Sequence, residues 1–281
     1  MKPSIVVLTN SSAAATQARA YAAVLAAPLG ADVHLVHVYP SPPMTSRVAA
    51  IMEATRERYV RQERRALEQM AADYPVPATA DTLEGGWDEA VPQALATYRP
   101  LLLVAGLTAT NGAFDEWLSN RTLPLARETG YPLLLVPEHL PATALHPPRR
   151  LALAVEDRAF VLAPQARGIA ALFDALATEI TTVTVVPAAG EEGGGHGHLA
   201  ARQSGLAATM PSSPLHRVVG PEPAPGIRQA VEELSADVLA LVDVGHGWVH
   251  KLLMDSVIEQ VLRETTVPVL LLSAPAADLN E

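Results

Sequence analysis

The strongest constraint on the fold is that the chain repeats its own pattern of apolar segments. The segment GYPLLLVP at 130–137 echoes TVPVLLLS at 266–273, and IVVLTN at 5–10 matches LALAVED at 151–157. Each opening segment is followed by an alanine-rich stretch with helical spacing. Continuous apolar strands that alternate with helices are typical of a parallel sheet covered on both faces. The sequence therefore predicts an α/β chain made of two similar halves, each with five strands.

A proline-rich segment separates the two halves. We place the first domain at 1–140, the linker at 141–149 and the second domain at 150–281. Prolines and short side chains are typical of connections between domains. The second half is the shorter one, and the loss falls in its second helical crossover.

Composition excludes several classes of protein. The chain is 49% hydrophobic and 18% charged, so we expect a packed core. Its formal net charge of −10 disfavours nucleic acid and anionic membrane surfaces as partners. The absence of cysteine excludes disulfides and thiol catalysis. No apolar stretch is long enough to span a bilayer, and we expect a cytoplasmic protein.

A long amphipathic helix is predicted at 46–74 in the first half. Its apolar positions lie at helical spacing, and arginine and glutamate occupy the opposite face. Such a charged face is either solvated, with ion pairs one turn apart, or it recruits a partner protein. The predicted apolar positions are Val48, Ile51, Met52, Ala66, Leu67 and Met70.

The corresponding region of the second half, 188–214, is rich in glycine and predicts a flexible surface loop. Within it, His196 and His198 raise the alternative of a metal site, completed by Glu191 or Glu192. Two histidines in a glycine run do not form a preorganised site, so the loop interpretation is the favoured one.

The segments IVVLTNSS, ARAYAAVLAAPLGA and DVHLVHVYP, followed by the final strand–loop–helix–strand, resemble the universal stress protein family. The chain resembles a tandem two-domain member, over about 3–138 and 150–273. The resemblance implies two flavodoxin-like (adenine nucleotide alpha hydrolase-like) domains, each a five-stranded parallel sheet with helices on both faces. It also implies pairing through the last strands, 132–137 and 268–273, as an intramolecular pseudo-dimer. A homodimer of the whole chain stays open.

Nucleotide-binding members of that family carry a motif after the fourth strand, G-x-x-G, nine residues, then G-S or G-T. Glycines let the backbone approach phosphates, and a helix N-terminus favours anions. Neither half keeps the whole motif, which implies an altered nucleotide site in both. The motif positions fall on Gly106, Ala109, Ser119 and Asn120 in the first half and on Val242, Gly245, Asp255 and Ser256 in the second.

Asp255 stands where the resemblance places phosphate oxygens. A carboxylate about 4 Å from a phosphate charge, at an effective dielectric near 20, costs roughly 4 kcal/mol unless Mg²⁺ bridges the two. Ser256 has two interpretations, a phosphate ligand or the N-cap of a capping box with Glu259, and the cap is favoured. Gly245 and Gly247 suit a tight loop whether or not anything binds.

The adenosine end of the resembled site is also altered. The family typically has an aspartate after the first strand; here the residues are Asn10 and Asp157. The ends of the second strands, which offer backbone groups to adenine, fall near Val38 and Val186. By this pattern the second half keeps slightly more of the site than the first.

No catalytic motif is visible, so an enzyme is not the favoured interpretation. We expect a stress-response protein that acts by binding or regulation; its cofactor is unknown, with ATP as the open candidate. One alternative is a nucleotide-binding protein or slow ATPase, for ATP or AMP, in which Asp157, Gly245 and Ser256 hold the nucleotide and Asp255 a metal. A further alternative is a scaffold that recruits a protein partner through helix 46–74.

Overall fold

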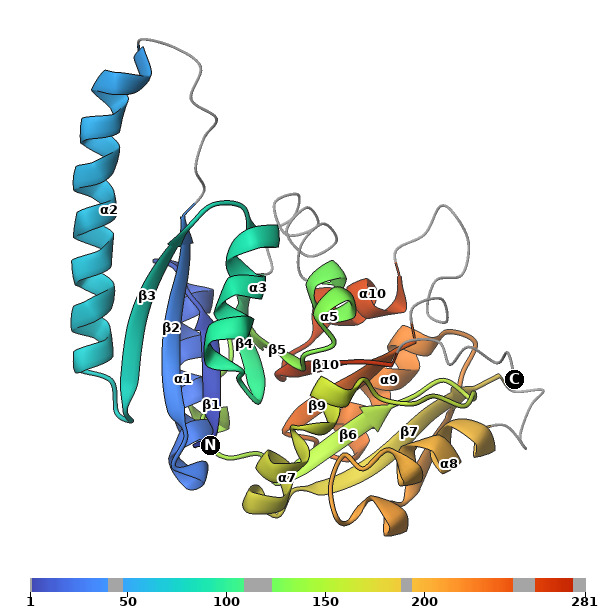
Figure 1. The fold of residues 1–281 in the computed structure, drawn as a ribbon. Coiled ribbons are helices and arrows are strands. Elements are labelled where there is room, and N and C mark those ends of the chain that lie inside the picture. The colour runs from blue at the N-terminus through green and yellow to red at the C-terminus, as the bar shows by residue number, and fades with distance from the viewer. Residues whose placement is uncertain (1, 40–47, 109–122, 188–193, 245–255, 275–281) are drawn as a thin grey trace, which may run out of the picture.

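The computed structural model shows one continuous, strongly twisted sheet with helices on both faces (Figure 1). The described residues are 2–39, 48–108, 123–187, 194–244 and 256–274. For 48–57 and for residue 123 the description covers the backbone alone.

The first half alternates strands and helices as its apolar pattern predicts. Its elements are β1 (Ser4–Leu8), α1 (Ala13–Leu29), β2 (Asp32–Tyr39), α2 (Val48–Ala72), β3 (Ala78–Glu84), α3 (Trp87–Tyr98), β4 (Leu102–Leu107), α5 (Leu123–Thr129) and β5 (Leu133–Pro137).

The second half repeats this order with shorter helices. A short 3₁₀ turn, η2 (Ala142–Ala144), lies between the halves. The elements that follow are β6 (Arg150–Ala154), α6 (Pro164–Arg167), α7 (Ala170–Leu176), β7 (Glu179–Val186), α8 (Gly195–Gln203), η3 (Met210–Ser212), β8 (Leu215–Val219), α9 (Pro223–Glu233), β9 (Val238–Asp243), α10 (Val257–Glu264) and β10 (Val269–Ser273).

The ten strands lie in the order β3-β2-β1-β4-β5-β10-β9-β6-β7-β8. All pairs within each half are parallel, whereas β5 and β10 pair antiparallel at the centre. Leu135 lies opposite Val269 and Leu133 opposite Leu271. The predicted pairing of the last strands is confirmed. Because β5 and β10 run in opposite directions, the carboxyl ends of β9 and β10 lie at the same edge of the sheet as the amino end of β5.

Alternate residues of each strand face two separate apolar layers. One layer packs the sheet against α1, α2, α7 and α8, and the other packs it against α3, α5, α9 and α10. In β1, Ile5 and Val7 belong to the first layer, while Val6 and Leu8 belong to the second. Because both faces of these strands are buried, their sequences are uninterrupted apolar runs.

The predicted long helix is confirmed as α2, which stands beside the outer strand β3 and extends past the end of the sheet (Figure 1). Leu67 is buried and Met70 is half-buried, but Ala66 is exposed, so the prediction was wrong there. Ala66 lies next to the contact face, where a methyl group has little to bury. The side chains of Val48, Ile51 and Met52 lie outside the described residues.

Part of the glycine-rich region is helical, in contrast to the predicted loop. Helix α8 begins at Gly195, and Asp157 holds its first turn as described below. A contact between distant residues thus overrides the local preference of the glycines. Among the helices of the described chain, none has the length and apolar character needed to cross a membrane.

Candidate functional site

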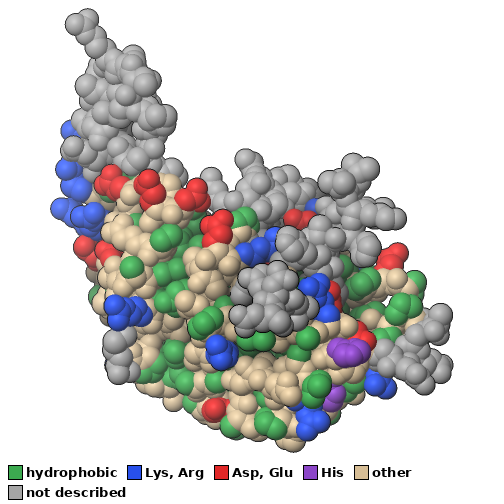
Figure 2. Space-filling model, turned by 45° about the vertical axis from the view of Figure 1, so that its right-hand side comes forward, with side chains coloured by type: hydrophobic (Ala, Val, Ile, Leu, Met, Phe, Trp, Pro, Cys, Tyr) green, Lys and Arg blue, Asp and Glu red, His purple; other side chains and the backbone are tan. Residues whose placement is uncertain are grey.

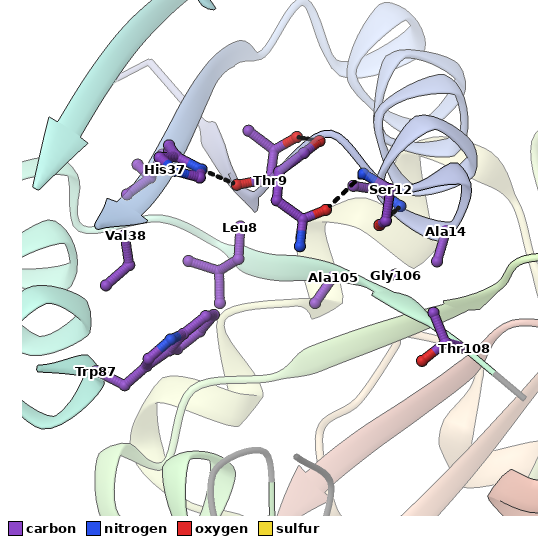
Figure 3. Close-up of a pocket in the computed structure, with 13 residues that line it drawn as sticks. Leu8, Thr9, Ser12, Ala14, His37, Val38, Trp87, Ala105, Gly106 and Thr108 are labelled. Carbon is purple, nitrogen blue, oxygen red and sulfur yellow. Dashed lines mark hydrogen bonds between the residues drawn. The ribbon is translucent and has the colours of Figure 1, made fainter. Parts of the chain in front are cut away.

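An open cavity of about 360 Å³ lies at the carboxyl ends of β1, β2 and β4 in the first half (Figure 3). This edge of a parallel sheet, where the connections diverge, is the usual place for a ligand in an open α/β fold. The cavity is lined by Leu8, Thr9, Asn10, Ser12, Ala14, Ala15, Val36, His37, Val38, Trp87, Ala105, Gly106 and Thr108.

A short polar turn connects β1 to α1 at the upper wall of the cavity. The side-chain oxygen of Asn10 accepts a hydrogen bond from the backbone N–H of Ser12 at 2.9 Å. The Ser12 hydroxyl in turn accepts from the backbone N–H of Ala15 at 3.1 Å and caps α1. These contacts fix the turn and present the amide NH₂ of Asn10 as a donor.

His37 is held in one orientation at the cavity wall. Its Nδ1 lies 2.8 Å from the carbonyl oxygen of Thr9, so Nδ1 carries the proton in this contact. In the neutral ring Nε2 is then an acceptor. The Thr9 hydroxyl receives a hydrogen bond of 2.5 Å from the guanidinium of Arg19, which fixes this strand end from the other side.

The two sides of the cavity differ in chemistry. Figure 3 shows Trp87 and Val38 on one side and Ala105, Gly106 and Thr108 across from them. Among the described lining residues there is no lysine or arginine. The cavity therefore combines an aromatic and aliphatic wall with uncharged hydrogen-bonding groups.

Gly106 has a packing role at this site. A Cβ built on Gly106 would lie 2.4 Å from the backbone carbon of Ala14 and 2.5 Å from its oxygen. These distances are far inside van der Waals contact. Only glycine lets the end of β4 pass directly against the first turn of α1.

The equivalent strand end of the second half is already occupied by its own chain. Asp157 accepts hydrogen bonds from the backbone N–H groups of His196 at 2.8 Å and Gly197 at 3.3 Å, at the start of α8. Burial alone would raise the pKa of Asp157, but the backbone donors of Gly194, Gly197 and His196 outweigh it and lower that pKa. A Cβ on Gly197 would lie 2.0 Å from the carbonyl oxygen of Glu156. Helix α8 is therefore packed directly onto the end of β6.

An ion pair connects the two halves near the carboxyl end of β9. Arg127 of α5 donates to both carboxylate oxygens of Asp243, with Nε at 2.5 Å and Nη2 at 3.3 Å. The Asp243 side chain is 6% exposed and that of Arg127 is 35% exposed. The triplet Arg-Glu-Thr begins at Arg127 in α5 and again at Arg263 in α10. In the first half, the residue at the strand position equivalent to Asp243 is Leu107, which has no carboxylate. The carboxylate of this ion pair therefore has no counterpart at the equivalent strand position of the first half.

Ser256 is the N-cap of α10, as favoured from the sequence. Its hydroxyl accepts from the backbone N–H of Glu259 at 3.2 Å, and the Glu259 carboxylate accepts from the backbone N–H of Ser256 at 2.9 Å. The capping box is confirmed. A phosphate-binding role for Ser256 stays a prediction.

The structure brings Asn10, Val38 and Gly106 together around the first-half cavity. In the second half, Asp157 holds α8 and Val186 is buried as the last residue of β7. Asn120, Gly245, Gly247 and Asp255 lie outside the described residues. The open cavity is thus in the half that keeps less of the motif.

The sequence reasoning missed four residues that shape these strand ends. Thr9 and His37 adjoin residues that it did select, and the repeated Arg-Glu-Thr triplet was a signal for Arg127. Nothing in the local pattern marks Asp243, because its partner is 116 residues away.

The proposed histidine metal site receives no support from the part of the chain that the structure describes. His198 directs Nε2 to the carbonyl oxygen of Ser213 at 2.9 Å, and the side chain of His196 is 82% exposed. No group of three metal-ligating side chains occurs among the described residues. Glu191 and Glu192 lie outside them.

The sequence profile of the Universal stress protein family matches residues 1–137 and 166–273. The chain belongs to the universal stress protein family. The expected family and the expected fold are both confirmed. No curated protein matches this universal stress protein significantly.

Solved structures show the same fold. A universal stress protein from Archaeoglobus fulgidus DSM 4304 superposes with a TM-score of 0.63 at 14% identity, over 98% of this chain and 97% of that one. A putative universal stress protein from Pseudomonas aeruginosa UCBPP-PA14 gives a TM-score of 0.51 at 16% identity, over 96% and 93%. At these identities the likeness concerns the fold of this universal stress protein, and its ligand has to be argued from its own residues.

Proposed function

We propose that this universal stress protein is a non-enzymatic stress-response protein that binds a small ligand in the first-half cavity. The observation that carries the proposal is the open space of about 360 Å³ bounded by Asn10, Val38 and Gly106. That volume lies within the range typical of small-molecule sites, near its lower limit.

The lining favours an uncharged molecule with a flat ring and several hydroxyl groups, such as an adenine nucleoside. Trp87 and Val38 offer an apolar wall for the ring. Asn10, Thr108 and Nε2 of His37 offer a donor, a hydroxyl and an acceptor for polar substituents. Because the described lining contains no lysine or arginine, a triphosphate would gain little from it.

Two contacts count against a nucleotide site or slow ATPase in the second half. Asp157 is occupied by the backbone of α8, so a ribose would have to displace that helix. The Ser256 hydroxyl already accepts the N–H of Glu259. The ATPase alternative therefore requires local rearrangement before binding.

Calorimetry with adenosine, AMP and ATP, each with and without Mg²⁺, tests the proposal. We expect adenosine to bind at least as tightly as ATP, Mg²⁺ to have no effect, and ATP turnover to stay at the buffer rate. Trp87→Ala should weaken adenosine binding by about tenfold, since stacking of a base on an aromatic ring is worth roughly 1–3 kcal/mol.

Asp157→Asn is the matched control in the second half. It should leave adenosine affinity unchanged while lowering stability. Tight, Mg²⁺-dependent ATP binding that Asp157→Asn abolishes would instead establish the second half as the site and overturn the proposal.

A scaffold role for α2 is the second candidate, favoured by the exposed basic face of that helix. Arg58, Arg64 and Arg65 are exposed, and Figure 2 shows basic side chains following one another along this edge of the molecule. In a chain of net charge −10, this local positive face suits an acidic protein partner. Affinity capture with wild type and with Arg58→Glu/Arg65→Glu tests it; identical sets of captured proteins would contradict it.

A further inference from the structure

A second open depression lies away from the first-half cavity, at the amino ends of β6 and β7. It has a volume of about 700 Å³ and is lined by His146, Arg149, Arg150, Ala177, Glu179 and Asp237. We propose that it is a second binding site, one that takes a small multiply charged anion of the phosphate type. The site does not depend on the function proposed for the first half.

The backbone around the depression is held by hydrogen bonds on every side. The backbone N–H groups of Arg149 and Arg150 both donate to Oδ2 of Asp237, at 2.8 and 2.9 Å. The carbonyl oxygens of the same two arginines accept from the N–H groups of Glu179 and Asp237, at 2.8 Å each. One residue earlier, the carbonyl of Pro148 accepts the Thr178 hydroxyl at 2.9 Å. The segment that carries the arginines is therefore preorganised by its main chain, and both guanidinium groups are left for other partners.

The two guanidinium groups differ from those arginines of the protein that a carboxylate holds in place. Arg127, Arg158 and Arg228 each pair with an acidic side chain. For Arg149 and Arg150, both exposed, no side-chain ion pair or hydrogen bond is present within the described part of the chain. A planar guanidinium group with free donors matches the oxygens of a phosphate group, and both arginines line the same depression.

Two acidic residues of the depression, Asp237 and Glu179, oppose this charge. Oδ2 of Asp237 is occupied by two backbone donors, and its Oδ1 lies 3.9 Å from Nε2 of His146. Nδ1 of His146 faces the carbonyl of Pro147 at 3.0 Å, so the ring presents Nε2 toward the carboxylate. Glu179 is the remaining negative side chain, exposed at the rim. An anion bound at the arginines is repelled by Glu179 and by the charge that Asp237 retains.

Titration of the whole 281-residue chain with inorganic phosphate and pyrophosphate at constant ionic strength, followed by calorimetry or backbone amide NMR, tests this site. We expect saturable binding, tighter for pyrophosphate, with shifts of the backbone amides of His146, Arg149 and Arg150. The double variant Arg149→Gln/Arg150→Gln should weaken binding about tenfold, as expected for losing two exposed charged contacts. Both glutamines keep the backbone donors to Asp237, so the unfolding midpoint should not change.

Two further variants separate a built site from general attraction between charges. Glu179→Gln removes the repelling carboxylate and should strengthen phosphate binding about twofold. Arg217→Gln removes an exposed arginine of the outer strand β8 and should change nothing. Absence of saturable binding, or equal weakening by Arg217→Gln and by the double variant, would overturn the proposal.

Discussion

Replacing Arg127 by alanine removes the guanidinium that joins α5 of the first half to Asp243 of the second. Two unit charges about 4 Å apart at an effective dielectric near 20 attract by roughly 4 kcal/mol. Removing one member of a buried ion pair typically costs about 3–5 kcal/mol. Because Arg127 is 35% exposed, solvent screening reduces this cost, and we expect Arg127→Ala to lower the free energy of unfolding by about 2–3 kcal/mol.

The measurement is equilibrium unfolding in urea, repeated by thermal denaturation. At about 2 °C per kcal/mol for a chain of this size, the midpoint should fall by about 4–6 °C. Arg263→Ala is the matched control, since Arg263 holds the equivalent position in α10 and is exposed. It should cost about 1 kcal/mol or less.

A double-mutant cycle isolates the pair. Asp243→Asn combined with Arg127→Ala should cost clearly less than the sum of the two single changes, with a coupling of about 2 kcal/mol. A coupling below about 0.5 kcal/mol, or a loss at Arg127 no larger than that at Arg263, would refute the reasoning that this pair fastens the two halves together.

Three other predictions concern single positions. Gly106→Ala should lower the free energy of unfolding by about 2 kcal/mol or more, because the added Cβ would clash with α1. Gly220→Ala is the control and should be nearly neutral, because its Cβ would meet nothing within 4 Å. The urea midpoints of both variants check this. Ser256→Ala should cost about 1 kcal/mol through loss of the cap, without changing adenosine binding by calorimetry. The pKa of Asp157 is lower in the folded state than in the unfolded state. The ionised carboxylate therefore stabilises the fold fully above the unfolded pKa of about 3.9, and this contribution is lost as the pH falls through the folded-state pKa. The difference in stability between wild type and Asp157→Asn should therefore be largest near neutral pH and vanish in acid, whereas a constant difference would contradict the assignment.

The sheet could be predicted because its signals are local and repeated. Apolar runs such as 130–137 and 266–273 indicate two-sided burial directly, and the resemblance to the family implied the central pairing. The state of each ligand site could not be predicted in this way. It depends on whether α8 reaches Asp157, 39 residues before His196, and on the pairing of Arg127 with a residue 116 positions later. The glycines at 194–197 predict a loop for the same reason. Their helical conformation depends on the distant carboxylate of Asp157, which accepts the N–H groups at the start of α8.

The antiparallel pairing of β5 and β10 joins the two halves through the edges of their sheets. Because both strands belong to one chain, these edges are already paired within a single molecule. The connection between the halves holds the two strands at a high effective concentration, so they meet without an encounter between molecules. A chain cut within 141–149 would turn that pairing into a bimolecular equilibrium. Its stability would then depend on dilution, and the apolar edges of β5 and β10 would be open to any other strand.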